Sequence, residues 1–220
     1  MRLLIKNIIV YFVLLISAQL TFAEDGISVT CDVASRYVWR GTDFGDSPSI
    51  QPGLSYVSGP LTVGAWSAWQ FSGQADENDL YVSYAVGPVI VTLTDYFFPG
   101  DDPTVDGGFT TFDADTGGHF LEAAFSGELS GVGYTGGYMF LEPDGDINSD
   151  VDPSIYLGLS AGPFMLGLGS GIYTAQDEDN GDDKFDVVEI GVTGSNDKYS
   201  CSWIFNPNQK TTFLVVTMSL

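Results

Sequence analysis

The amino-acid sequence predicts an all-β fold, an antiparallel up-and-down transmembrane β-barrel of about twelve strands with both termini periplasmic. Three observations support this prediction. Segments of about ten residues alternate apolar and polar side chains. The breaks between them alternate between short Gly/Pro turns and longer, mostly acidic loops. Aromatic residues recur near both ends of the apolar faces, as they do at the two interfaces of a membrane barrel.

Residues 1–23 precede the first of these segments. They combine Arg2 and Lys6 with an apolar run over 8–16 and a small-residue site ending at Ala23, which is typical of a secretory signal peptide. A membrane anchor is the alternative, but this run is shorter than the roughly 20 residues that a spanning helix needs. We therefore expect an exported domain over 24–220, and any membrane insertion of this domain must use closed β-structure.

The first strand segment shows the pattern on which the others are identified. Residues 27–40 place apolar side chains, from Ile27 to Trp39, on one face and polar side chains on the other. The same test identifies eleven further segments, at 49–58, 60–72, 79–87, 88–98, 119–127, 131–141, 154–161, 163–174, 185–194, 199–206 and 211–220. The even total of twelve agrees with a single-chain bacterial barrel.

The two kinds of break predict how the barrel is oriented. Short breaks lie at 58–60, 87–88, 127–131, 161–163 and 194–197, whereas mostly longer ones lie at 41–48, 73–78, 99–118, 142–153, 175–184 and 207–210. If both termini lie on the side of the turns, every long loop falls on the opposite side. Short periplasmic turns and long extracellular loops follow.

Aromatic side chains on the apolar faces form two predicted belts. One belt lies at the loop ends of the strands and contains Trp39, Trp69, Phe71, Phe140 and Phe205, and the other lies at the turn ends and contains Tyr56, Tyr84, Phe125, Phe164 and Tyr199. A soluble β-sandwich with a core of aromatic residues is the alternative. A sandwich explains neither the two belts nor the one-sided loop length.

Charge and cysteine content narrow the class of partner. The net charge is −22, and removal of Arg2 and Lys6 brings it to about −24, which argues against nucleic acid. Cys31 and Cys201 lie within strand segments that are not expected to be neighbours. A disulfide is possible chemistry in an exported protein, but we expect two unpaired cysteines.

The last segment, TTFLVVTMSL, places Leu214, Val216, Met218 and Leu220 on one face. It is similar to the C-terminal strand by which the barrel assembly machinery recognises its substrates, with Leu220 in place of the usual aromatic residue. Paired with the first strand, it closes the ring and leaves no exposed edge.

Several motifs resemble those of one bacterial family. Residues 35–41, SRYVWRG, followed by PSIQP at 48–52, are similar to the opening signature of the TorF-type porins, a group of unknown function. The stretch TDYFFP at 94–99 and the segment that begins at His119 also resemble members of this family. The resemblance covers most of the mature chain. It implies an outer-membrane barrel with a pore, and it carries no established substrate and no catalytic residue.

The predicted lumen face supplies the candidate selectivity residues, which are Asp32, Arg36, Arg40, Glu122 and Glu189. The two arginines lie on the lumen face of the first segment, where they either form a cationic strip for anions or pair with Glu122 or Glu189 and brace the barrel. Small inward residues leave room for a pore, although Trp66, Tyr81, Tyr156 and Tyr173 are large enough to fill it. Twelve strands lie between filled small barrels and wide porins.

Two acidic loops are candidate calcium sites. Closely spaced oxygen ligands suit a hard cation, and the candidates are Asp144, Asp146, Asn148, Asp150, Asp177 and Asp179. Neither loop follows the spacing of the twelve-residue calcium loop. A solvated acidic loop is therefore the main expectation, with weak calcium binding or bridging to lipopolysaccharide as the alternative.

An enzymatic function has little support in the sequence. The single histidine, His119, has no Ser, Thr or Cys close beside it on its face of the strand, whereas covalent hydrolysis needs a nucleophile next to a base. Asp95 falls on the lipid-facing side by strict alternation, and a bulge near Thr94 is expected to turn it inward. We expect a non-enzyme without a cofactor.

These observations together predict an outer-membrane porin for passive diffusion of small solutes, in contact with outer-membrane lipid and lipopolysaccharide. The alternative is a non-conducting structural or surface-interaction barrel whose acidic extracellular loops bind cations. The acidic mouth attracts cations and the lumen arginines attract anions, so both signs of selectivity stay open.

Overall fold

The computed structural model describes residues 25–73, 76–100, 108–113, 117–142, 145–146, 153–175 and 185–220. The predicted signal peptide, 1–23, lies outside these residues. Within the described part, no helix is long and apolar enough to cross a membrane.

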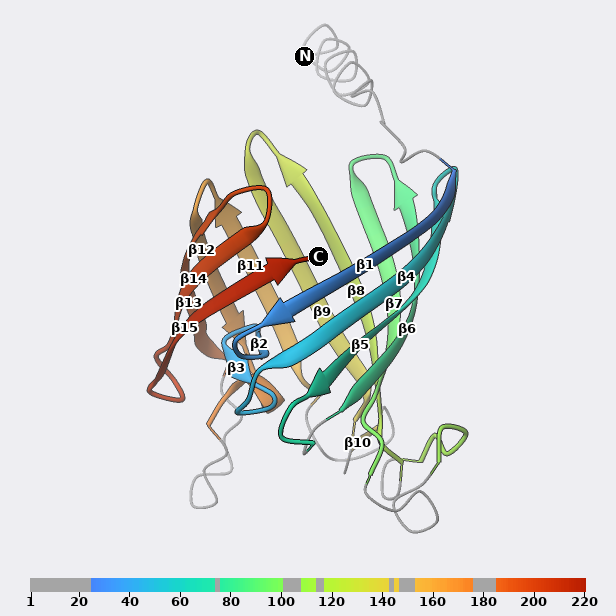
Figure 1. The fold of residues 1–220 in the computed structure, drawn as a ribbon, viewed down its shortest axis with the longest axis horizontal. Helices are drawn as coiled ribbons and strands as arrows, with labels where there is room; N and C mark the ends of the chain where they lie inside the picture. Colours follow the sequence, from blue (N-terminus) through green and yellow to red (C-terminus); the bar gives the residue numbers. More distant parts are fainter. Residues whose placement is uncertain are drawn as a thin grey trace, which may run out of the picture.

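Antiparallel strands close into a ring (Figure 1), which confirms the predicted barrel and excludes the two-sheet sandwich. The sheet of the described residues has 13 strands, and because β10 (Gly145–Asp146) only extends the pairing of β9, 12 strands form the ring. These are β1 (Gly26–Ala34), β4 (Ser49–Ser58), β5 (Leu61–Gln70), β6 (Glu77–Val86), β7 (Val89–Phe97), β8 (His119–Leu129), β9 (Val132–Glu142), β11 (Ile155–Ala161), β12 (Phe164–Gly169), β13 (Asp186–Ser195), β14 (Tyr199–Asn206) and β15 (Thr211–Ser219).

Two strands end five or more residues before the predicted position. The first was expected over 27–40, but β1 ends at Ala34, and the chain then turns into the lumen as a small hairpin of β2 (Val38–Trp39) and β3 (Thr42–Asp43). The ninth was expected over 163–174, but β12 ends at Gly169, and a single 3₁₀ turn, η1 (Gly171–Tyr173), follows. The placement of Arg36, Trp39 and Arg40 on strand one is therefore wrong.

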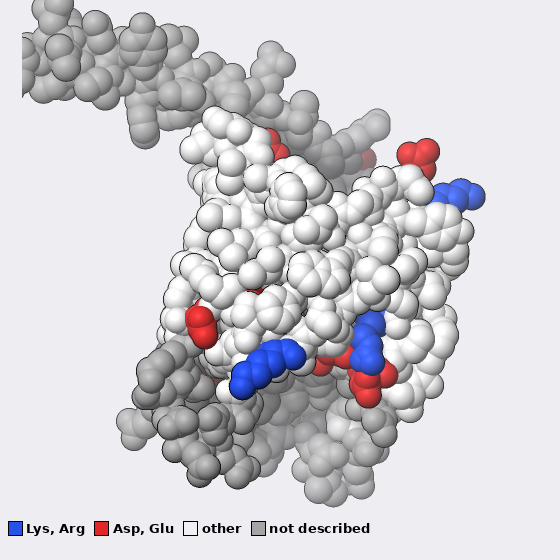
Figure 2. Space-filling view, turned by 90° about the vertical axis from the view of Figure 1, so that its left-hand side faces the viewer, with Lys and Arg blue, Asp and Glu red and all other residues white. Residues whose placement is uncertain are grey.

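The outer wall of the ring is apolar and exposed. Most of the predicted belt residues face outward, with exposed rings at both ends of the strands at Trp69, Phe71, Tyr56, Tyr84, Phe125, Phe164 and Tyr199. Trp39 is the exception, because it lies in the lumen and packs on Tyr173. Figure 2 shows one side of the barrel as almost free of charged groups between its two ends.

The ring is weakest where its first and last strands meet. The ladder between β1 and β15 contains three residue pairs, from Asp32↔Ser219 to Ala34↔Thr217, whereas β1 and β4 pair over nine. Ile27 and Val29, on the part of β1 outside the ladder with β15, are about three-quarters exposed. Cys31 and Cys201 are free, as expected, and β15 lies between their strands.

Asp95 is an acidic side chain in a largely apolar part of the described outer wall. The expected bulge near Thr94 is absent, because β7 pairs with both neighbours without a shift of register from Val89 to Phe97. Asp95 therefore keeps the outward side, and its Oδ1 lies 2.7 Å from Nδ1 of His119. The expectation that Asp95 turns inward is wrong.

Aromatic rings cover this outward pair. Phe112 stacks on the His119 ring at 4.0 Å between centroids, and Phe97 and Phe109 contact the same ring at 4.6 and 5.6 Å. The His119 side chain is fully buried. The segment 108–113 thus shields a polar pair that the wall would otherwise expose.

We expect His119→Leu to lower the free energy of unfolding by about 2 kcal/mol, because the Asp95 carboxyl loses its buried partner. The double variant Asp95→Leu/His119→Leu should recover most of this loss, since both polar groups are then absent. Urea unfolding of refolded protein in lipid vesicles, followed by tryptophan fluorescence, measures both. An equal loss in the double variant would contradict a pairing role.

Candidate functional site: a hairpin folded into the lumen

Residues 35–48, called here the lumen hairpin, leave the wall after β1 and return to it at β4. Val38 pairs with Asp43 and Trp39 with Thr42, so Arg40 and Gly41 are the two central residues of the turn. Their φ angles are 51° and 81°, and positive values at both positions are the mark of a type I′ hairpin turn. A Cβ atom at Gly41 would overlap the carbonyl oxygen of Val188, so the turn seats directly on β13.

Arg40 connects the tip of the lumen hairpin to the opposite wall. Its guanidinium donates to both carboxylate oxygens of Glu122 on β8, with Nη2 at 3.1 Å from Oε2, and donates to the Tyr173 hydroxyl at 2.6 Å. The side chain of Arg40 is 10% exposed and that of Glu122 is 2% exposed. Two buried charges are thus paired in the bidentate geometry that arginine favours.

Tyrosines extend this ion pair around the ring. Tyr96 on β7 donates to Glu122 at 2.9 Å, and Tyr156 on β11 donates to Glu189 on β13 at 2.6 Å. The Arg40 guanidinium also lies over the Tyr156 ring, 4.6 Å from its centroid. The Arg40 network, as these five side chains and Tyr173 are called below, joins the hairpin to four strands and η1.

The 3₁₀ turn η1 anchors the hairpin from the side. Trp39 packs edge-on against Tyr173 at 5.7 Å. Asn206, fully buried at the end of β14, donates to the carbonyl oxygens of Gly41 and Tyr173 at 3.4 and 3.2 Å. Gln209 donates to Thr42 and to the Tyr173 carbonyl, both at 3.2 Å. The lumen hairpin and η1, which were both predicted to continue wall strands, therefore hold each other inside the barrel.

Arg36 has a local role. It pairs with Asp43 at 2.6 Å and with Asp46, both within its own hairpin. The predicted pairing with Glu122 or Glu189 is therefore found for Arg40 alone, through Glu122, whereas Glu189 accepts its hydrogen bond from Tyr156.

The other predicted site residues are divided between lumen and rim. Asp32 faces the lumen from β1, opposite Gln51 and Ser219 in the ladders. Asp144, Asn148, Asp150, Asp177 and Asp179 lie outside the described residues, and of Asp146 only the backbone is described, paired with Leu141. Across the described ranges, no cluster of three or more side chains suited to a metal is present.

Sequence reasoning missed an acid pair on β6. Glu77 and Asp79 face the lumen, are 1% and 7% exposed, and hydrogen-bond each other. Tyr37 of the hairpin donates to Glu77, and burial, followed by the nearby Glu77, raises the pKa of the Tyr37 hydroxyl well above its ordinary value, so it remains a donor. The i, i+2 spacing put both acids on one face, but Glu77 fell inside a predicted loop.

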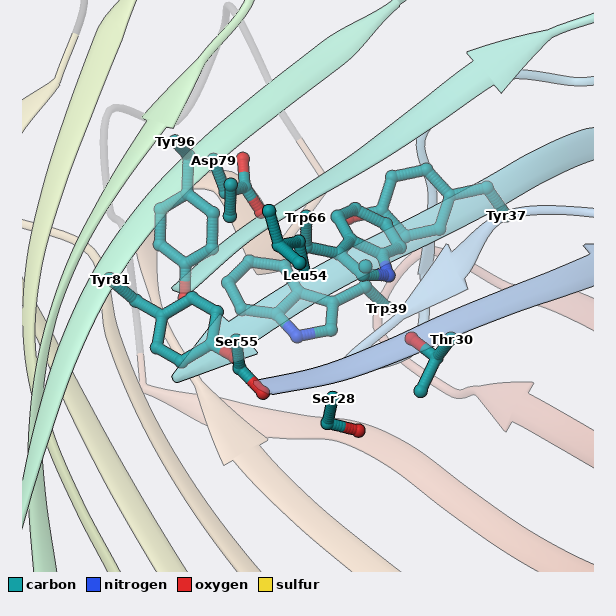
Figure 3. A pocket seen from close by; sticks show the side chains of 12 residues that line it. Ser28, Thr30, Tyr37, Trp39, Leu54, Ser55, Trp66, Asp79, Tyr81 and Tyr96 are labelled. Carbon is teal, nitrogen blue, oxygen red and sulfur yellow. The ribbon is translucent and has the colours of Figure 1, made fainter. Parts of the chain in front are cut away.

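The turn-side half of the lumen is hollow. Beneath the hairpin lies a cavity of about 360 Å³, whose walls come from β1, β4, β5, β6, β7 and the hairpin (Figure 3). A second cavity of about 230 Å³ lies between β9, β11 and β12. At the loop side, by contrast, the space between the hairpin and the wall near Met139 and Ile172 is only about 10 Å³.

Comparison with known proteins gives no assignment, because no family model and no curated protein sequence matches the chain.

Arg40→Ala should destabilise the barrel by about 3 kcal/mol, because it leaves the buried Glu122 carboxylate without its counter-charge. Arg36→Ala is the matched control, with an expected loss of about 1 kcal/mol or less, since its partner Asp46 is largely solvent-exposed. Urea unfolding in lipid vesicles measures the difference. Equal losses for the two variants would contradict the central place of the Arg40–Glu122 pair.

Proposed function

We propose that this protein is an outer-membrane channel for passive diffusion of small solutes, and that the lumen hairpin closes it in the conformation described here. The observation that carries the proposal is the uneven filling of the ring. The loop half is packed by the hairpin and the Arg40 network, while the turn half contains two cavities. A solute path needs only displacement of the hairpin.

The outer wall supports a membrane location. Large apolar side chains are exposed on every strand from β4 to β9, and soluble monomers rarely expose apolar patches larger than a few hundred Å². In a closed ring of strands, the backbone N–H and C=O groups hydrogen-bond to one another, which is necessary because lipid offers them no partners. The 12-strand ring also agrees with the outer-membrane class of barrel.

The remaining parts of the proposal rest on sequence. They are export by the signal peptide over 1–23, periplasmic termini, assembly through the C-terminal strand, and contact with outer-membrane lipid and lipopolysaccharide. The resemblance of residues 35–41 and 48–52 to TorF-type porins supports the same class, and these residues include most of the lumen hairpin. No nucleic acid, cofactor or catalytic step belongs to the proposal.

The chemistry of the hairpin supports an equilibrium rather than a fixed plug. The segment carries two arginines and two aspartates, so it is soluble when it leaves the lumen. Its inward state depends chiefly on one buried ion pair, one close turn on Val188 and the bonds from Asn206 and Gln209. A non-conducting structural barrel is the second candidate, favoured by the number of elements that the Arg40 network joins.

The membrane location is tested by fractionation. We expect the protein in the outer-membrane fraction, with a gel mobility that changes on heating because the folded barrel resists detergent. Release by osmotic shock without such a mobility change would contradict the membrane proposal.

Conduction is tested in planar lipid bilayers. We expect the wild-type protein to conduct in rare openings, and Arg40→Ala and Gly41→Ala to raise the open fraction by about tenfold or more, because each weakens the seat of the hairpin by at least 1.4 kcal/mol. Lys198→Ala, at the turn end of β14, is the control and should behave as wild type.

A complete lack of conductance in both hairpin variants, over a range of salt and voltage, would contradict the channel and favour the structural barrel. Deletion of residues 100–117 separates the two further. A channel should still conduct without this loop, whereas a role in surface interaction should be lost.

A further inference from the structure

The cavity beneath the lumen hairpin has an unusual lining. Five aromatic side chains line it, and Figure 3 shows Tyr81 and Tyr96 on the left, Trp39 and Trp66 in the middle and Tyr37 on the right. The rings of Trp39 and Tyr96 are in contact, with 5.1 Å between their centroids, and those of Tyr37 and Trp66 are in contact with 5.5 Å between theirs. This set of five rings is called the aromatic cage below. The faces of such rings carry partial negative charge and attract cations.

One carboxyl group belongs to the lining of the cavity. Asp79 is only 7% exposed, and its Oδ1 has no hydrogen-bond partner among the described residues. The Glu77 carboxyl lies beside it on the same strand. A buried carboxyl oxygen without a partner is costly, which indicates a missing ligand group.

The described lining of the cavity contains an acid and no basic side chain. The residues that line it, all of them described, include no Lys, Arg or His. Arg40 lies behind Trp39, with its guanidinium 4.1 Å from the Trp39 ring centroid, and Glu122 already balances its charge. Asp79, with Glu77 beside it on β6, is the acidic group at the cavity, and no basic side chain of the described lining faces it.

The walls nearer the turns are polar but uncharged. Ser28, Thr30 and Ser55 contribute hydroxyl groups, and Tyr81 extends over Gly64, where a side chain would occupy the same space. A ligand in this cavity therefore meets rings on several sides, one acid pair and a few hydroxyl groups. Its volume of about 360 Å³ suits a small organic molecule rather than a bare ion.

From these contacts we propose that the aromatic cage and Asp79 form a binding site for small organic cations, in particular alkylated ammonium groups. The cationic head lies against Asp79 and the ring faces, and its alkyl groups replace water at the rings. This inference rests on the proposed function in one respect: if the barrel is a channel, such cations are among its solutes and bind below the closed hairpin. Binding itself needs no conduction.

The test uses purified, refolded full-length mature protein in a non-ionic detergent. Tetramethylammonium chloride is titrated at constant ionic strength against sodium chloride, and calorimetry and tryptophan fluorescence report binding. Two of the 4 tryptophans, Trp39 and Trp66, belong to the cage, so emission should change on saturation. We expect a dissociation constant of about 1 mM or lower. Neopentyl alcohol, neutral and of similar shape, should bind at least about tenfold more weakly.

Matched variants separate the site from general effects. Asp79→Asn and Trp66→Leu should each weaken binding about tenfold or more. Asp32→Asn changes a lumen acid outside the cavity, and Trp69→Leu changes the outward tryptophan of the same strand, so both should bind as wild type. Tyr81→Leu, at the edge of the cage, provides a further cage variant should Asp79→Asn fail to show the folded gel mobility.

Three outcomes overturn the inference: no saturable binding of tetramethylammonium by the wild type, equal binding of neopentyl alcohol, or unchanged binding in the folded cage variants. The channel proposal is contradicted by different results. If the protein binds the cation but no hairpin variant conducts, the cation site stands and the channel is contradicted. If it conducts but does not bind the cation, the channel stands and the cation site is contradicted.

Discussion

The Arg40–Glu122 ion pair is the interaction on which the interior of this barrel depends. Both side chains are almost fully buried, and each would be strongly unfavourable in the lumen without the other. Because Arg40 stands at the tip of a type I′ turn, the pair also fixes a whole hairpin in position. Tyr96 and Tyr173 then find hydrogen-bond partners on the same two charged groups. The packed half of the lumen follows from this single charge and its counter-charge.

The barrel treats polar groups on its two surfaces in different ways. In the lumen, tyrosines hydrogen-bond to the buried acids, and a cavity of about 360 Å³ remains on the turn side. On the outer wall, the pair of Asp95 and His119 is enclosed by three phenylalanines. An apolar phase offers no hydrogen bonds, so an outward carboxyl group needs both a partner and a cover.

In the proposed channel, the lumen hairpin is a two-state element whose closed state depends on one buried ion pair. Its inward state gains the bidentate contact and the aromatic packing, and its outward state regains the hydration of the arginines and aspartates. Since these contributions oppose each other, small changes in salt, ligand or sequence shift the populations. The aromatic cage lies directly under the same hairpin and shares Tyr37 and Trp39 with it. The two proposals together therefore predict that occupancy of the cage and position of the hairpin are coupled.

The alternation of side chains by itself determined the ring: segments such as 49–58 and 199–206 form strands with those bounds, because a wall between an apolar and a polar phase imposes a period of two. The pattern also extended to Trp39, and there it misled, since a tryptophan in a period-two position has the same spacing on a wall as in a hairpin. Only the tertiary structure decided that 35–48 and 171–173 turn inward. The reason is that partners more than 80 residues away, Glu122 for Arg40 and Asn206 for Gly41, make the lumen the favourable place for them.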